Sequence, residues 1–247
     1  MHKIINAEKI PFDSRKKVKI FIEKLLDLHK ENVKMISLYG SAAGIDYRPK
    51  VSDINLLCIF EDVNFDVLKK SLKLVSWGIS KRIAAPLFLS SEYIRSSLDV
   101  FPMEFLEMKE NYILLYGEDL LDGLHIESKN IRLFCEEQIK GKLIRIRQAY
   151  LEIGLKKKGM EALLKESLNG LIPAFRNILR LKGMVPPIDK EKILSDLSYT
   201  FGLEKNIFLD ILRGKKNDKK IRPRNIEHYM ERFIEQIKRL SLIVDKL

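Results

Sequence analysis

The residues best suited to chemistry lie between positions 36 and 60. An apolar run ends in Gly40-Ser41, and after eleven further residues Asp53-Ile54-Asn55 opens a second apolar run. Glycine lets a backbone approach a phosphate closely, and the N–H groups and hydroxyl of such a turn can bind phosphate oxygens. Residues i and i+2 of a strand point to one face, so Asp53 and Asn55 would present two oxygen ligands suited to Mg²⁺. The spacing predicts a phosphate and metal site.

This order of strand, Gly-Ser turn, intervening segment and acid at the head of a second strand resembles the DNA polymerase β-like nucleotidyltransferase superfamily, whose pattern is GS followed by D-x-D. Asn55 stands where the family has its second acid. The resemblance implies a nucleoside triphosphate substrate and Mg²⁺ or Mn²⁺. It implies that Asp53 and Asn55 are catalytic metal ligands, and that Gly40 and Ser41 bind the nucleotide. An amide carries no charge, so a two-metal site loses one unit of charge compensation here.

The family's third carboxylate lies on a later strand. Glu104, within the run 101–108, is the best match as a further catalytic metal ligand, with Glu107 as the alternative. Downstream, LLYGEDL (114–120) resembles a structural stretch that closes many small nucleotidyltransferases. Arg48 and Lys50, in the loop before Asp53, are candidates for binding the nucleotide phosphates, or are ordinary surface charges.

Other interpretations of the same residues stay open. Gly40 and Ser41 also suit an ordinary strand-to-helix turn with the serine as a cap. Asp53 also suits a cap of its strand, and Glu104 suits a solvent-facing strand position. Under these alternatives the predicted fold is the same, but the residues do not form a phosphate or metal site.

Two differently patterned segments must position these residues. The first has helical spacing over 13–31 and 66–76, and apolar strand-like runs at 35–38, 54–60, 85–89 and 101–108. From about Leu124 the pattern is helical throughout, over 130–155, 160–181, 189–212 and 224–246. We therefore predict an α+β fold: a nucleotidyltransferase-like mixed sheet with flanking helices over 1–124, followed by an all-α bundle over 125–247.

Charge is divided unequally between these segments. Residues 1–127 hold 18 Lys and Arg against 19 Asp and Glu, whereas residues 128–247 hold 27 against 15. A basic helical segment indicates an anionic partner such as nucleotide or nucleic acid, or else a set of solvated loops. Lys140, Lys142, Arg145 and Arg147 are the helical cations expected to face a nucleotide or acceptor.

Composition fits a cytoplasmic protein. No apolar stretch approaches the roughly 20 residues that span a bilayer, so no membrane partner is expected. Cys58 and Cys135 are predicted to be buried thiols rather than a disulfide. The leading hypothesis is a metal-dependent nucleotidyltransferase that transfers a nucleoside monophosphate to an unidentified acceptor hydroxyl. The alternatives are a catalytically weakened, nucleotide-binding or regulatory module, and a nucleic-acid-binding protein that uses the basic helical segment.

Overall fold

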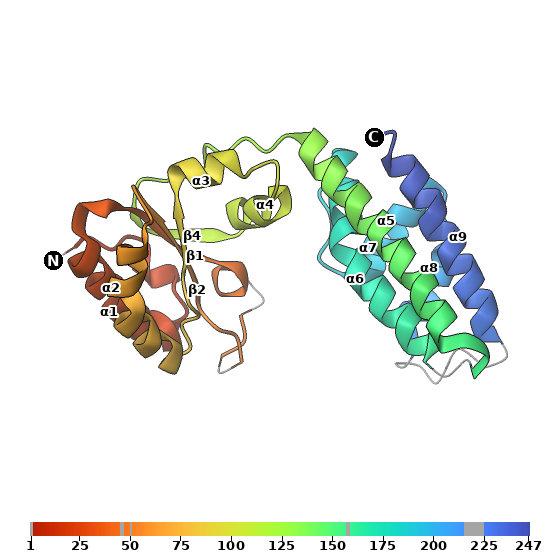
Figure 1. The fold of residues 1–247 in the computed structure, drawn as a ribbon, viewed down its shortest axis with the longest axis horizontal. Coiled ribbons are helices and arrows are strands. Elements are labelled where there is room, and N and C mark those ends of the chain that lie inside the picture. Colours follow the sequence, from red (N-terminus) through yellow and green to blue (C-terminus); the bar gives the residue numbers. More distant parts are fainter. Residues whose placement is uncertain (1, 45–46, 50, 157–158, 215–224) are drawn as a thin grey trace. The chain divides into compact units, whose positions relative to one another are not determined.

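The computed structural model describes residues 2–44, 47–49, 51–156, 159–214 and 225–247. The chain forms two compact units, Met1–Ile126 and Glu127–Leu247. We call these the sheet unit and the helical unit. Figure 1 shows the strands and helices of the first and the helices alone of the second. Among the described residues, no helix is long and apolar enough to cross a membrane.

The sheet unit alternates helices and strands. Its elements are α1 (Phe12–His29), β1 (Val33–Tyr39), β2 (Asn55–Phe60), α2 (Phe65–Ser80), β3 (Leu87–Ser90), α3 (Ser91–Ser96), α4 (Pro102–Glu110) and β4 (Tyr112–Gly117), with short 3₁₀ turns at Ala7–Lys9, Lys30–Asn32 and Gly40–Ala43. The strands form one mixed sheet in the order β3-β2-β1-β4. β1 pairs antiparallel with both β2 and β4, whereas β2 and β3 are parallel.

The sheet buries both of its faces. On one face, Ile54, Leu56, Cys58 and Phe60 join the core beneath α1 and α2. On the other, Leu57 and Ile59 pack with residues of α3 and α4. Alternation along a strand explains the division, since even-numbered residues of β2 face one layer and odd-numbered ones the other. Asn55 therefore belongs to the α3–α4 face.

The strand predicted over 101–108 is wrong. These residues form α4, with Pro102 at its first position and Met103, Phe105 and Met108 buried. Proline is favoured at the first helical position because its missing N–H has no partner there, and Phe105 and Met108 share a helical face. The strand lies immediately after the helix, at Tyr112–Gly117.

The helical unit contains α5 (Ser128–Ile153), a 3₁₀ turn (Gly154–Lys156), α6 (Met160–Leu181), α7 (Lys190–Phe201), α8 (Lys205–Arg213) and α9 (Ile226–Val244). The single helix predicted over 189–212 is in fact two, because Gly202 ends α7 with a left-handed backbone, at φ +64°. Phe175, Phe208 and Phe233 are fully buried, and the ring of Phe208 makes edge-to-face contact with each of the other two, at 6.1 Å between centroids. Both cysteines are free and buried, as predicted.

Candidate functional site

The Gly-Ser turn lies at the end of β1, beside the start of β2. Tyr39, the last residue of β1, pairs with Asn55, the first residue of β2. Gly40 adopts φ +73°, a left-handed conformation that only glycine reaches without strain. A Cβ added at Gly40 would lie 3.4 Å from the Asn55 amide nitrogen. The turn and the head of β2 are therefore adjacent, which supports the site that the spacing predicted.

Backbone bonding fixes the turn. The Gly40 N–H donates to the Asn111 carbonyl at 3.3 Å, and the Gly44 N–H to the Ser41 carbonyl at 3.2 Å. The N–H groups of the first residues of such a turn have no partner inside it. Within the described part of the chain, the Ser41 hydroxyl also has no hydrogen-bond partner. Since the Gly40 N–H is already bonded to Asn111, Ser41 is the residue of the turn that is free to bind an anion.

Asp53 immediately precedes β2. Its neighbour Ile54 is fully buried on the α1–α2 face and bridges to Ile83. Alternation therefore turns Asp53 toward the face of Asn55. Asp53 is exposed and Asn55 half-buried, and no described residue pairs with the Asp53 carboxylate. One carboxylate and one amide are thus available at this end of the sheet.

The strands around Asp53 and Asn55 supply no further carboxylate in the described part of the chain. β2 pairs with β3 through Leu57 and Leu87, and through the bridge of Ile54 with Ile83. Residues 84–86, which run beside Asn55, are Ala-Ala-Pro. None of the described strands carries an Asp or Glu, and no group of three His, Cys, Asp or Glu in the described ranges could hold a metal ion.

Glu104 does not occupy the position that the sequence predicted for it. It lies on α4, a helix, with its side chain exposed while Met103 and Phe105 are buried. Glu107, the alternative, is exposed on the same helix. The argument that Glu104 shares a strand face with Asp53 is therefore removed, and we assign neither glutamate a role.

The loop before Asp53 is only partly described. Arg48 is exposed, and its carbonyl accepts the N–H groups of Val51 and Ser52 at 3.1 and 2.9 Å. Tyr47 anchors the loop, since its hydroxyl donates to the Asp13 carboxylate at 2.9 Å. Lys50 lies outside the described residues.

Two tyrosines at this edge were missed by the sequence analysis. Tyr39 pairs with Asn55 on one side and with Tyr112 of β4 on the other, so these three side chains form a row on the α3–α4 face. The Tyr112 hydroxyl donates to Asp119 at 2.6 Å. Burial, followed by the bond and charge of that carboxylate, raises the tyrosine pKa well above its usual range. The position of Tyr39 directly before the Gly40-Ser41 turn was the available signal for the first of them.

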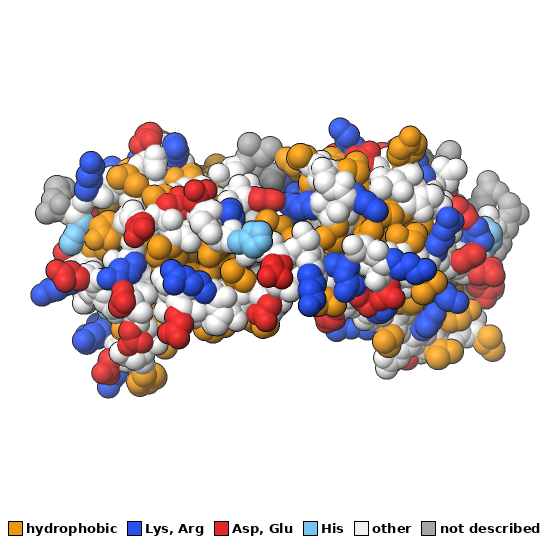
Figure 2. Space-filling view, turned by 90° about the horizontal axis from the view of Figure 1, so that it is seen from above, with side chains coloured by type: hydrophobic (Ala, Val, Ile, Leu, Met, Phe, Trp, Pro, Cys, Tyr) orange, Lys and Arg blue, Asp and Glu red, His pale blue; other side chains and the backbone are white. Residues whose placement is uncertain are grey.

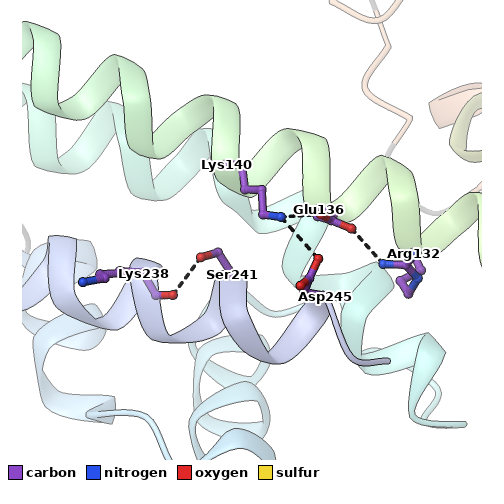
Figure 3. Close-up of polar contacts among 6 residues, drawn as sticks. All are labelled: Arg132, Glu136, Lys140, Lys238, Ser241 and Asp245. Atoms are coloured by element: carbon purple, nitrogen blue, oxygen red, sulfur yellow. Dashed lines mark hydrogen bonds and ion pairs between the residues drawn. The ribbon is translucent and has the colours of Figure 1, made fainter.

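The basic residues expected to face a nucleotide lie on α5. Lys140 is paired with Glu136 and, at 3.3 Å, with Asp245 of α9, while Glu136 also binds Arg132 at 2.7 Å (Figure 3). The hydrogen bond to Glu136 is the main cause that raises the pKa of Lys140, and the bond to Asp245 and the charges of both carboxylates add to it. On the face seen in Figure 2, cationic and anionic side chains are interspersed in both units.

The other α5 cations differ in their surroundings. The Lys142 side chain packs against Gly170 of α6, where an added Cβ would lie only 2.8 Å from the Lys142 ammonium nitrogen. Arg145 and Arg147 are exposed. Lys140 is therefore neutralised within the helical unit, whereas the two arginines present their charges to solvent.

Comparison with known proteins identifies the fold. No model of a known protein family matches this chain, and no curated protein sequence matches it significantly. Among solved structures, the chain is similar to the spectinomycin adenyltransferase AAD(9) from Enterococcus faecialis, crystallised with ATP and spectinomycin. The match has 13% sequence identity and a TM-score of 0.50, and covers 92% of this chain and 99% of the other. The chain therefore has an α+β, nucleotidyltransferase-like fold.

Proposed function

We propose that this protein binds a nucleoside triphosphate at Gly40 and Ser41 and transfers its nucleoside monophosphate to an acceptor hydroxyl. The observation that carries the proposal is the adjacency of the Gly40 turn to Asn55, which brings the phosphate-binding turn and the head of β2 together. The similar adenyltransferase structure contains ATP and an acceptor molecule, which supports a nucleotide and a small-molecule acceptor here.

The donor atoms fit one magnesium ion better than two. Mg²⁺ is commonly held by one or two carboxylates together with substrate phosphates and water. Asp53 would supply a carboxylate, and Asn55 would supply its amide oxygen. When bound, the ion would neutralise charge on the triphosphate.

The protein's own residues contribute positioning more than covalent chemistry. Ser41 and the backbone of the turn would hold the phosphate oxygens, and Asp53 would fix the nucleotide at the head of β2. The acceptor oxygen bonds to the α-phosphorus while the bond from that phosphorus to the bridging oxygen breaks. Pyrophosphate leaves, and the hydroxyl proton passes to solvent. Since the described strands offer no third carboxylate as a base, we expect slow turnover.

One observation favours a second candidate function. Asn55 stands where the resembled family has a carboxylate, and residues 84–86, which run beside Asn55, contain no acid. A site with one carboxylate suits nucleotide binding without transfer, as in a regulatory module. Binding and turnover must therefore be measured separately.

The test is a screen of ATP, GTP, CTP and UTP for Mg²⁺-dependent binding and for pyrophosphate release. The proposal predicts binding of at least one nucleotide and slow release when acceptors are supplied. Asp53→Asn, which keeps the side-chain volume, should reduce both. The matched control is Glu104→Gln, which removes the same charge from exposed α4 and should change neither. Binding without release supports the regulatory module, and no binding by wild-type protein rejects both functions.

A further inference from the structure

A second candidate site lies on the opposite face of the sheet unit. A groove of about 440 Å³ runs between α1 and α2, and its lining includes Lys24, Asp27, Lys70, Lys73 and Trp77 with two leucines. We call it the Trp77 groove. Both helices cover the sheet face formed by Ile54 and Leu56, whereas Asn55 lies on the other face. The groove is therefore separate from the proposed nucleotide site and independent of it.

The charge of the groove is unbalanced. Lys24, Lys70 and Lys73 face one aspartate, Asp27, and none of the three lysines forms an ion pair within the described ranges of the chain. Asp27 already contacts His2, with the ring Nε2 3.2 Å from its carboxylate. Three exposed ammonium groups with no anionic partner favour a polyanionic ligand.

Trp77 supplies a flat surface among these charges. It is half-buried and packs against the core beneath α1 and α2, which fixes its ring. The Lys24 ammonium nitrogen lies 5.1 Å from the ring centroid, so the indole face is turned into the groove toward a cation. Such a contact at an exposed site is weaker than the stacking of a nucleobase on an aromatic ring. A base could therefore displace Lys24 from the ring and leave its ammonium group to bind phosphate.

We propose that the Trp77 groove binds a single-stranded nucleic acid, with a base stacked on Trp77 and phosphates held by Lys24, Lys70 and Lys73. An aromatic platform inside a positively charged groove is the usual arrangement for single strands. An acidic peptide would satisfy the lysines but would leave the indole face unused. The amino groups of bases, by contrast, can donate to Asp27.

The chain's single tryptophan makes the test direct. A fluorescein-labelled 12-nucleotide oligodeoxycytidylate is titrated with the full chain, with fluorescence anisotropy reporting binding and tryptophan emission reporting stacking. We expect quenching of Trp77 emission. With three phosphate contacts, the logarithm of the binding constant should fall against the logarithm of salt concentration with a slope of about −2.

The variants separate charge from stacking. Lys70→Gln and Lys73→Gln should each reduce the magnitude of the salt slope by about 0.7. Trp77→Leu should weaken binding about 5- to 150-fold, whereas Trp77→Phe should keep most of it. The control is Lys19→Gln, an exposed α1 lysine about 140° around the helix from Lys24, which should have no effect.

Three results would overturn the inference. The first is no binding of the oligonucleotide by a folded wild-type protein. The second is binding that the lysine and tryptophan substitutions leave unchanged, which would place the nucleic acid elsewhere. The third is tighter binding of polyglutamate than of the oligonucleotide, which would assign the groove to an acidic peptide. Asp53→Asn should leave oligonucleotide binding intact, so failure of the proposed transferase function is distinguishable from failure of this inference.

Discussion

Asn55 is the position at which a single substitution most informs the proposed chemistry. Asn55→Asp keeps almost the same side-chain volume and adds one negative charge at the head of β2. The side chain is half-buried, and its nitrogen is 3.4 Å from where a Gly40 Cβ would lie, so a carboxylate of equal size fits the space. We therefore expect the variant to fold.

The magnitude follows from two contributions. A charge-assisted contact to a metal should strengthen binding by about 1–3 kcal/mol, which is about 5- to 150-fold in Kd. Residues i and i+2 of a strand are about 6.6 Å apart, so in the metal-free variant the new carboxylate repels that of Asp53 by about 0.6 kcal/mol in water. This repulsion lowers the stability of the metal-free protein and is relieved when a cation binds. The variant should thus be slightly less stable alone and bind metal more tightly.

The assay is calorimetric titration of Mn²⁺ into both proteins with ATP present. The control, Asn64→Asp, adds the same charge to an exposed residue beyond the other end of β2, whose side-chain oxygen caps α2 and would still do so as a carboxylate. Tighter binding by Asn55→Asp alone supports a metal site at the head of β2. Equal affinity in wild type and Asn55→Asp would show that Asn55 does not contact a metal, and the reasoning would fail.

Three further predictions concern the turn and the two cores. Gly40→Ala forces a side chain into φ +73° and should lower the free energy of unfolding by about 1–2 kcal/mol in urea, while weakening nucleotide binding; unchanged values for both would contradict the assigned role of the turn. Burial, and then the charge of a nearby lysine, lowers the pKa of His29, so the unfolded chain binds a proton more readily. Stability conferred by neutral His29 is full above about pH 6.5 and should fall below it by at most about 1.4 kcal/mol per pH unit; His29→Gln should flatten this dependence, and an identical slope would refute it. Phe208→Ala removes the central ring of the Phe175–Phe208–Phe233 stack and should cost about 3–5 kcal/mol in urea unfolding; a loss below 1 kcal/mol would mean that the core closes around the gap.

The strongest part of the sequence prediction was the segment with the clearest local constraints. The apolar runs around Leu38 and Leu56 became adjacent strands because both sheet faces are buried, and Gly40 stands where the backbone turns left-handed. The predicted helix over 13–31 was confirmed as α1, with its apolar stripe in the core. Mixed α+β architecture with a nucleotidyltransferase-like fold was likewise confirmed.

The failures share a physical origin. Residues 101–108 are few, and their apolar positions match both a period of two and part of a helical stripe, so periodicity alone did not decide between them. Pro102 favours the helix, because proline suits the first helical position. Because the run was predicted to be a strand, the strand that follows it at Tyr112–Gly117 was not predicted, and Glu104 was wrongly placed on a strand.

The surroundings of the candidate site depend on pairing between distant segments. The row of Asn55, Tyr39 and Tyr112 exists because β1 lies between β2 and β4, an order that no local pattern reveals. The Ala84–Pro86 segment beside Asn55 is set in the same way by the parallel pairing of β3. Sequence therefore predicted Asp53 and Asn55 as donors, which stays a prediction, and the topology shows that the neighbouring strand adds no acid.

The proposed nucleotide site is tested most directly by locating a bound metal nucleotide on the protein. In ¹⁵N-resolved NMR spectra, paramagnetic Mn²⁺ with ATP broadens the amide signals of residues near the ion. The account predicts that Gly40, Ser41, Asp53 and Asn55 lose intensity first, and that Asp53→Asn restores their signals at the same Mn²⁺ concentration. Sharp signals for these four residues at concentrations that broaden another part of the chain would contradict it.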